Sequence, residues 1–240
     1  MAHLHRFYHP HTLPDSGDIT LSRDESHHAM RVVRARQGDD VALFDGRGTV
    51  AQGTISALNR NEVVVAVTAT HSVERPAPAL TLAQAWLHRD KIVDEIVRQG
   101  TVLGVAEFLF FRGAHSEKKP RLADKWERIA IEACKQCGRS WLPRFTVLES
   151  LSEVVAQAEG QCLVVARMEG PHVPLAQTAT GSPVTYVVGP EGDFSEGELV
   201  ALEGAGALPV SLGDCTYRAE MAAQVGVTLI QHHLGFVGPK

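Results

Sequence analysis

The stretch Thr185-Tyr-Val-Val-Gly-Pro-Glu-Gly-Asp-Phe-Ser-Glu-Gly-Glu198 decides the fold class of this 240-residue chain. It continues a β-rich apolar run, 184–188, that is short enough to be a buried strand. Gly189-Pro190 ends the run, and Ser195 with Glu198 has the spacing of a capping box that starts a helix. A strand, a glycine-containing loop and a helix therefore follow one another.

A second unit of the same kind follows at Val210-Ser-Leu-Gly-Asp-Cys-Thr-Tyr-Arg-Ala-Glu220. Open α/β sheets bind ligands in loops at the carboxyl ends of neighbouring strands. These two loops are therefore the best candidates for a binding site in the chain.

The remaining sequence shows two successive patterns. Residues 1–70 favour β-structure, with a hairpin at Asp45-Gly46-Arg47-Gly48 and a short helix at 25–33 capped by Ser22; a compact barrel would close these short strands. A proline-containing linker, 72–78, follows. Beyond it strands are predicted at 80–85, 107–111, 145–148, 162–166, 184–188 and 209–212, and helices at 90–103, 122–137, from 150 and 219–233. This alternation indicates an α/β domain with a mostly parallel sheet, and domains at 1–72 and 76–240.

Composition excludes some protein classes. The formal net charge is −5, yet residues 86–145 carry 12 basic against 8 acidic side chains, so a nucleic-acid partner stays open. No apolar run approaches the ~20 residues that span a bilayer, and the first residues lack the apolar stretch of a secretory signal. Four cysteines without a framework pattern fit a reducing compartment, so we expect a cytoplasmic protein without a membrane partner.

Two patterns resemble metal or redox sites but favour a structural interpretation. Cys134-Lys-Gln-Cys137 lies in the last turns of a predicted helix, on its apolar stripe, and lacks two further zinc ligands. The histidines near the start of the chain alternate as on one strand face, without a carboxylate or cysteine beside them: His3, His5, His9 and His11. We therefore expect no metal.

Several arginines could contact a polyanion or a developing charge. Arg31 and Arg34 follow His28 on the predicted short helix, where phosphate contact and a solvated basic face are equally good interpretations. Arg139 follows a helix end, and Arg218 enters the last helix. Two arginines beside one cleft would stabilise charge developing on a planar, oxygen-bearing base.

Taken in order, these motifs resemble the RsmE-type methyltransferases of the SPOUT superfamily. The resemblance rests on Val188-Gly-Pro-Glu-Gly, on Val210-Ser-Leu-Gly with Arg218-x-Glu220, and on Glu132-Ala-Cys-Lys-Gln-Cys-Gly-Arg139. It covers nearly the whole chain. It implies methylation of N3 of a uridine in small-subunit (16S) ribosomal RNA with S-adenosylmethionine, a catalytic domain with a C-terminal trefoil knot, an N-terminal PUA-like β-barrel, and a homodimer.

The resemblance also implies roles for particular residues. Arg218, Arg139 and Glu220 would be catalytic, with Glu191 and Glu220 both open as the general base. The methyl donor would be bound by Val188, Gly189, Glu191, Gly192, Val210, Leu212, Gly213, Cys215, Tyr217 and Arg218. RNA would be contacted by Arg6, His28, Arg31, Arg34 and Lys91.

The chain departs from the family pattern in both loops. Asp193 stands where the family usually has a second glycine, and Cys215 and Tyr217 are among five substitutions in the second loop. These departures leave a second hypothesis open, a non-catalytic RNA- or ribosome-binding relative that retains the donor pocket.

The last predicted helix carries an apolar stripe that needs a partner, either the chain's own sheet or a second subunit. The stripe consists of Met221, Val225 and Leu229, and a neighbouring face of small residues would allow a close helix approach: Ala222, Ala223 and Gly226. The family resemblance favours the second subunit.

Overall fold

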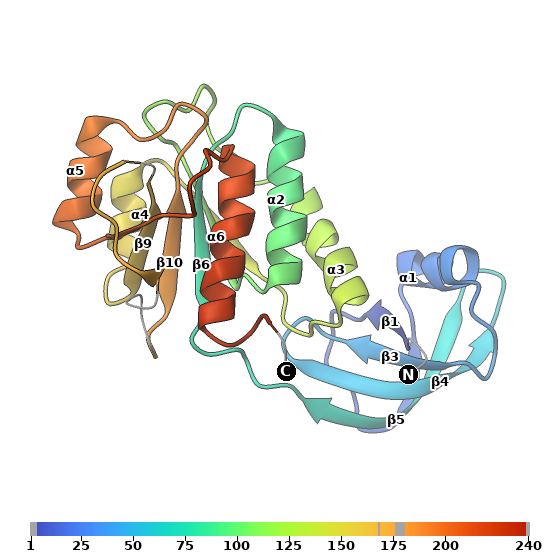
Figure 1. Cartoon of the computed structure of the whole chain (residues 1–240). Helices are drawn as coiled ribbons and strands as arrows, with labels where there is room; N and C mark the ends of the chain where they lie inside the picture. Colours follow the sequence, from blue (N-terminus) through green and yellow to red (C-terminus); the bar gives the residue numbers. More distant parts are fainter. Residues whose placement is uncertain (1–3, 168, 176–180, 239–240) are drawn as a thin grey trace. The chain divides into compact units, whose positions relative to one another are not determined.

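The computed structural model describes residues 4–167, 169–175 and 181–238, in two compact units (Figure 1). The first comprises the chain up to Arg75 together with Ile131–Leu142. The second comprises Pro76–Ala130 and the chain from Pro143 onward. Residues 131–142, expected in the second domain, are therefore part of the first unit, while the change of unit near residue 75 falls in the predicted linker.

The first unit is built on a five-stranded sheet in the order β1-β3-β4-β5-β2. The predicted hairpin at Asp45–Gly48 joins β3 to β4 and is confirmed by their antiparallel pairing. Strands β1 and β2 are the two ends of the order, so a closed barrel stays a prediction. The strands are β1 (His5–Tyr8), β2 (Gly17–Thr20), β3 (Asp40–Phe44), β4 (Thr49–Leu58) and β5 (Val63–Ser72).

The helical segment expected at 25–33 is not a single α-helix. Helix α1 (Arg23–His27) begins two residues earlier than predicted, directly after the predicted cap, and the Ser22 side chain accepts a hydrogen bond from the Glu25 backbone N–H. A π-helical segment, η1 (His28–Val33), continues it and ends at Arg34, whose φ of 58° is left-handed. A π turn is wider than an α turn, so different side chains share a face. The prediction of one continuous α-helix over this segment was therefore wrong.

The second unit contains a six-stranded sheet in the order β11-β9-β10-β6-β7-β8. Every pairing in it is parallel, as expected for an α/β domain. The strands are β6 (Leu80–Ala85), β7 (Glu107–Phe111), β8 (Arg144–Leu148), β9 (Cys162–Ala166), β10 (Val184–Val188) and β11 (Leu208–Val210). The last strand is shorter and earlier than the predicted 209–212.

Helices accompany this sheet on its two faces (Figure 1). They are α2 (Asp90–Leu103), α3 (Lys125–Cys137), α4 (Leu151–Gln157), α5 (Glu196–Gly204) and α6 (Ala219–His233), and α3 passes from the second unit into the first. The predicted caps are confirmed at Ser150 and Ser195, and Ser195 forms the full capping box with Glu198. Helix α3 begins at Lys125, three residues later than predicted.

Helix α6 packs very closely against the centre of the sheet. Gly226 faces Tyr186 of β10, and a Cβ on Gly226 would lie 2.2 Å from the tyrosine ring. The buried Tyr186 hydroxyl donates to the Ala222 carbonyl at 3.0 Å. Burial raises the pKa of this phenol, which therefore stays a neutral donor. The small residues Ala223 and Gly226 thus serve contact with the chain's own sheet and do not form the free face that the sequence suggested.

Strand β11 has β9 on one side and Val173, from the loop that follows β9, on the other. On one side Leu208–Val210 pairs with Val164–Ala166 of β9. In the loop after β9, the N–H of Arg167 donates to the Val210 carbonyl, and that of Val173 to the Pro209 carbonyl at 2.8 Å. The Arg167 bond continues the pairing of β9 with β11, whereas the Val173 bond brings the loop that leaves β9 back beside β11.

Candidate functional site

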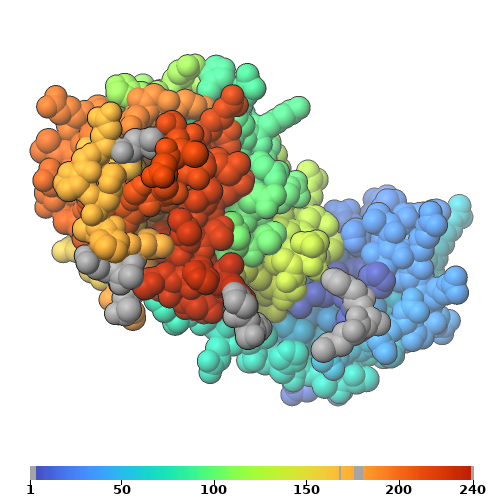
Figure 2. Space-filling model, in the orientation of Figure 1, coloured from blue at the N-terminus to red at the C-terminus, as the bar shows by residue number. Residues whose placement is uncertain are grey.

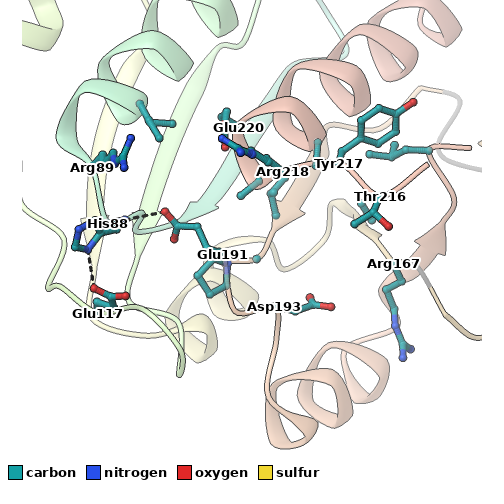
Figure 3. A pocket seen from close by; sticks show the side chains of 18 residues that line it. His88, Arg89, Glu117, Arg167, Glu191, Asp193, Thr216, Tyr217, Arg218 and Glu220 are labelled. Atoms are coloured by element: carbon teal, nitrogen blue, oxygen red, sulfur yellow. Dashed lines mark hydrogen bonds and ion pairs between the residues drawn. The ribbon is translucent and has the colours of Figure 1, made fainter. Parts of the chain in front are cut away.

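A cavity of about 660 Å³ opens in the second unit at the carboxyl ends of β6, β9 and β10 (Figure 3). Its size is that of a small-molecule site. The cavity is lined by the loops after these strands, by the loop after β7 through Glu117, and by the segment that leads into α6. The labelled lining side chains are His88, Arg89, Glu117, Arg167, Glu191, Asp193, Thr216, Tyr217, Arg218 and Glu220.

The loop after β10 forms one wall of the cavity, and a buried glutamine on the neighbouring strand β6 holds the start of this loop by a hydrogen bond. Gln84 of β6 is fully buried, and its Nε2 donates to the Gly189 carbonyl at 3.1 Å and to the Ala85 carbonyl at 3.0 Å. Its Oε1 is buried without a partner among the described residues. The strand end at Gly189 is thereby tied to the neighbouring strand.

A polar network joins this wall to the loop after β6. The backbone N–H of His88 donates to Glu191 Oε1 at 3.0 Å, and His88 Nδ1 lies 2.6 Å from Glu117 Oε2. Lys118 Nζ donates to the His88 carbonyl at 2.6 Å. In Figure 3 His88, Glu117 and Glu191 lie together on one side of the cavity, opposite Arg167 and Thr216. One Glu191 oxygen is thus engaged in holding the two loops together.

The other wall is the segment from Leu212 to α6. Arg218 is the N-cap residue of α6 with extended backbone, so its exposed side chain projects where the helix begins. Glu220 lies in the first turn of the helix, and Ala222 adds a small apolar contact surface. Cationic and carboxylate groups therefore face the same space beside apolar side chains. Such a site suits a ligand that has an apolar body and charged ends.

Many of the predicted site residues converge on this cavity. Seven of them line it: Val188, Gly189, Glu191, Leu212, Tyr217, Arg218 and Glu220. Four others lie in the same loops without lining it: Gly192, Val210, Gly213 and Cys215. Val210 is buried, Cys215 is exposed, and Gly213 has a φ of 120° that other residues rarely adopt.

Sequence reasoning did not select six charged or polar lining residues, of which Asp193 and Thr216 lie in the two predicted loops and four lie elsewhere: His88, Arg89, Glu117 and Arg167. His88, Arg89 and Arg167 each follow a parallel strand closely, and the rule that strand ends form the site would have selected them. Glu117 lies in a long loop between β7 and α3. Its place beside His88 depends on the tertiary course of that loop, which no local pattern shows.

The predicted residues of the first unit have other surroundings. The Arg6 guanidinium donates to the Arg139 carbonyl and to Ser140 Oγ, both at 3.1 Å, and lies 5.2 Å from the Phe44 ring centroid. Burial lowers the pKa of Arg6. Arg6 therefore helps to hold the Arg139 backbone, and its contact with RNA stays a prediction.

The remaining predicted RNA contacts lie on the π segment and on α2. Arg31 and Arg34 are exposed, while His28 is half-buried. Lys91 is exposed in the first turn of α2 and is not among the residues lining the cavity. Their contacts with RNA stay predictions.

The cysteines and histidines of the two predicted patterns have different surroundings. Cys134 is buried, and burial raises the pKa of its thiol to about 12, so it is an unreactive core group as expected. His9 and His11 contact each other edge to face, whereas His3 lies outside the described residues. Over the described ranges there is no cluster of three metal-ligating side chains. In that same portion of the chain, no helix has the length and apolarity to cross a bilayer.

Comparison with known proteins agrees with this geometry. A family model described as an RNA methyltransferase domain matches residues 74–231, and one described as an RNA methyltransferase PUA domain matches residues 21–68. Ribosomal RNA small subunit methyltransferase E of Synechocystis is 30% identical over 220 residues, covering 88% of this chain and 72% of the relative.

Solved structures share the fold over almost the full length. A protein from Porphyromonas gingivalis superposes with a TM-score of 0.85 at 30% identity, covering 97% of this chain and 99% of that one. A protein from Legionella pneumophila, in complex with the bound cofactor SAM, gives a TM-score of 0.83 at 27% identity and covers 95% and 97%. The chain therefore belongs to the RNA methyltransferase family whose members include ribosomal RNA small subunit methyltransferase E.

Proposed function

We propose that the chain binds S-adenosylmethionine in the cavity and transfers its methyl group to N3 of a uridine in small-subunit (16S) ribosomal RNA. The observation that carries this proposal is the convergence of both glycine-containing loops, with Arg218 and Glu220, on one cavity at the strand ends. A solved relative with bound SAM and a relative named as a small-subunit rRNA methyltransferase support the same donor and substrate class. We place the activity in the cytoplasm, where ribosomal RNA is available.

The residues present fit the proposed donor. Val188, Leu212 and Ala222 offer apolar contacts for an adenine ring, and the chain beside them offers backbone groups for its polar edge. The carboxylates of Glu191 and Asp193 offer negative charge to a sulfonium and an ammonium group. A cavity of about 660 Å³ is large enough for a molecule of this size.

Arg218 and Glu220 are the proposed catalytic pair. When bound, the donor supplies an electrophilic methyl group. Uridine N3 carries a proton and becomes nucleophilic only as that proton leaves, so the negative charge spreading to O2 and O4 needs a partner. The Arg218 guanidinium would stabilise this charge. Glu220 would take the proton, because one oxygen of the alternative base, Glu191, already accepts from His88.

We further propose that the segment after β11 is threaded as the family's trefoil knot. The support is the hydrogen bond from Val173, in the loop after β9, to Pro209 of β11, and the return of the chain to α6 against the central strands. Because the loop and the segment after β11 both line the cavity, through Arg167 and through Thr216 and Arg218, the knot would hold these walls together.

We propose that the protein works as a homodimer whose interface includes α6. Met221 is 46% exposed and Leu229 37% exposed, so the chain's own sheet does not cover the stripe. The outer face of α6 lies at the surface of the second unit, drawn in red in Figure 2. A second subunit would bury this apolar surface. Arg139, whose proposed role is to orient the target base or its phosphate, would then be shared across the subunit junction, as the family resemblance implies.

Three measurements test the proposed activity. Calorimetry should show binding of S-adenosylmethionine and of its demethylated product. Small ribosomal subunits lacking the modification should gain a reverse-transcription stop after incubation with protein and donor, because N3 methylation blocks base pairing. Mass spectrometry of digested rRNA should identify 3-methyluridine. Donor binding without a stop would favour the non-catalytic relative, and no donor binding would contradict the proposal.

A further inference from the structure

The loop after β10 contains a residue in an unusual backbone conformation. Asp193 has a φ of 60°, one of two non-glycine residues at positive φ among the residues described. This left-handed region is costly for residues with a Cβ, although aspartate tolerates it better than most. Asp193 lines the cavity, so whatever stabilises its conformation also shapes the site.

Part of the stabilisation is local. The Asp193 N–H donates to the Pro190 carbonyl at 3.0 Å and closes a turn. The Asp193 Oδ1 accepts from the backbone N–H of Phe194 at 2.8 Å. These bonds hold the two ends of the turn but do not involve the carbonyl groups of Gly192 and Asp193, which accept from a residue outside the turn.

That residue is His115, from the loop after β7. Its Nδ1 lies 2.9 Å from the Gly192 carbonyl oxygen and 3.0 Å from that of Asp193. Carbonyl oxygens only accept, so Nδ1 carries the hydrogen and donates to both. The two segments are also in close van der Waals contact, because a Cβ on Gly192 would lie 2.9 Å from the His115 Cβ. Only glycine at 192 allows this approach.

The segment that carries His115 is itself anchored. Ser116 Oγ donates to the Trp86 carbonyl at 2.9 Å and accepts from the Gly113 N–H at 3.1 Å. The Ala114 N–H donates to Glu198 Oε1 at 2.9 Å. His115 therefore projects from a turn that is fixed to β6 and to α5, and it acts on the Gly192–Asp193 backbone from a rigid support.

We propose that His115 is a positioning residue that holds Gly192–Asp193 in the left-handed turn and thereby sets the affinity for the methyl donor. We call the two hydrogen bonds from His115 to the Gly192 and Asp193 carbonyls the clamp. The effect of the clamp on donor binding rests on the proposed function, whereas the clamp itself does not. The physical reason for this effect is that Glu191 and Asp193 both line the cavity on either side of Gly192. Relaxation of the turn would move the backbone that carries both carboxylates.

A double-mutant cycle tests the clamp. His115→Phe keeps a ring but removes the donor, while His115→Asn retains a side-chain N–H at a similar reach. Asp193→Gly removes the Cβ that makes the left-handed turn costly. His115→Phe should weaken donor binding about tenfold, the usual worth of two lost hydrogen bonds, and His115→Asn should restore most of it. In the Asp193→Gly background, His115→Phe should raise the logarithm of the donor dissociation constant by less than half of the increase that it causes in the native background.

Hydrogen exchange of the amides at 191–194, measured without any donor, gives an independent readout. His115→Phe should accelerate this exchange in the native background, and His71→Phe, at an exposed histidine in the first unit, should not. Equal exchange and affinity in His115→Phe and native protein would overturn the clamp, as would an undiminished effect in Asp193→Gly. If native protein bound no donor, the proposed function would fail, while the exchange data would still decide on the clamp.

Discussion

Replacing Gly226 with alanine should destabilise the protein although alanine is the better helix former. The new Cβ would lie 2.2 Å from Cζ and from the hydroxyl oxygen of Tyr186, well inside contact distance. The obstructing group is a fully buried ring and not the free end of a flexible side chain. Helix α6 must therefore move away from β10, or the ring must leave its rotamer.

The size of the effect follows from three contributions. Overpacking a well-filled core costs about 1–3 kcal/mol, and the severity of this overlap favours the upper end. Losing the bond from Tyr186 to the Ala222 carbonyl costs about 1 kcal/mol more. Higher helix propensity returns about 1 kcal/mol. We expect a net loss of about 2–3 kcal/mol in the free energy of unfolding.

Urea denaturation of the two proteins measures this loss directly. Gly197→Ala in α5 is the matched control, because a Cβ there has nothing within 4 Å and should be neutral or slightly stabilising. Donor affinity should fall in Gly226→Ala as well, since Ala219 and Ala222 on the same helix line the cavity. Unchanged or increased stability of Gly226→Ala would refute the close packing of α6 on Tyr186.

Further predictions address the site, the dimer and the first unit. Arg218→Ala should leave donor affinity nearly intact and reduce methyl transfer by roughly two to three orders of magnitude; a parallel collapse of affinity in calorimetry would make Arg218 a pocket-building residue. Gly213→Val should abolish donor binding in a folded chain, because valine strongly disfavours a φ of 120°, and unchanged affinity would contradict the role of that loop. Sedimentation at low micromolar concentration should give about twice the 26.0 kDa chain mass, and Met221→Lys with Leu229→Lys should shift it toward one chain; native protein at 26.0 kDa would exclude the dimer. Lys135 forms a buried ion pair with Glu25, and Lys135→Met leaves the Glu25 carboxylate unpaired. This substitution should lower the free energy of unfolding by about 3 kcal/mol, measured by urea denaturation, and a neutral effect would show that the pair contributes no stability.

Local sequence signals predicted most of the fold. Strand β10, its glycine-containing loop and the capping box at Ser195 were all readable, because each depends on residues within a few positions. The parallel sheet followed from the alternation of strands and helices. Both site loops followed from the rule that strand ends bind ligands, and Arg218 and Glu220 from the family resemblance.

Features that depend on distant contacts were not predictable in the same way. The π-helical turn at His28–Val33 has the composition of an ordinary helix. Glu117 reaches the cavity only because its loop is fixed by Ser116 to the Trp86 carbonyl. Gly226 suggested a helix–helix contact between subunits, whereas its actual neighbour is Tyr186, 40 positions earlier in the chain. In each case the deciding contact joins segments that no sequence window contains.

The division of α3 between two units has a consequence for synthesis on the ribosome. Phe44 in the first unit packs with Cys134, and Ile131 and Leu142 complete that cluster. Buried Glu25 pairs with Lys135 at 3.0 Å across 110 positions of sequence. A nascent chain that has emerged only as far as the linker therefore has every residue of the larger core at 7–67 but lacks the residues that complete this smaller cluster.

At about 5–20 residues per second, the 67 positions from Arg75 to Leu142 take roughly 3–13 s to synthesise, and this smaller cluster stays incomplete during that time. For the same reason, a fragment that ends at Arg75 should be insoluble or bound to chaperones, whereas one that extends past Leu142 has every residue of this core. The first unit can therefore complete its packing only after Leu142 has been synthesised, although its own strands end at Ser72.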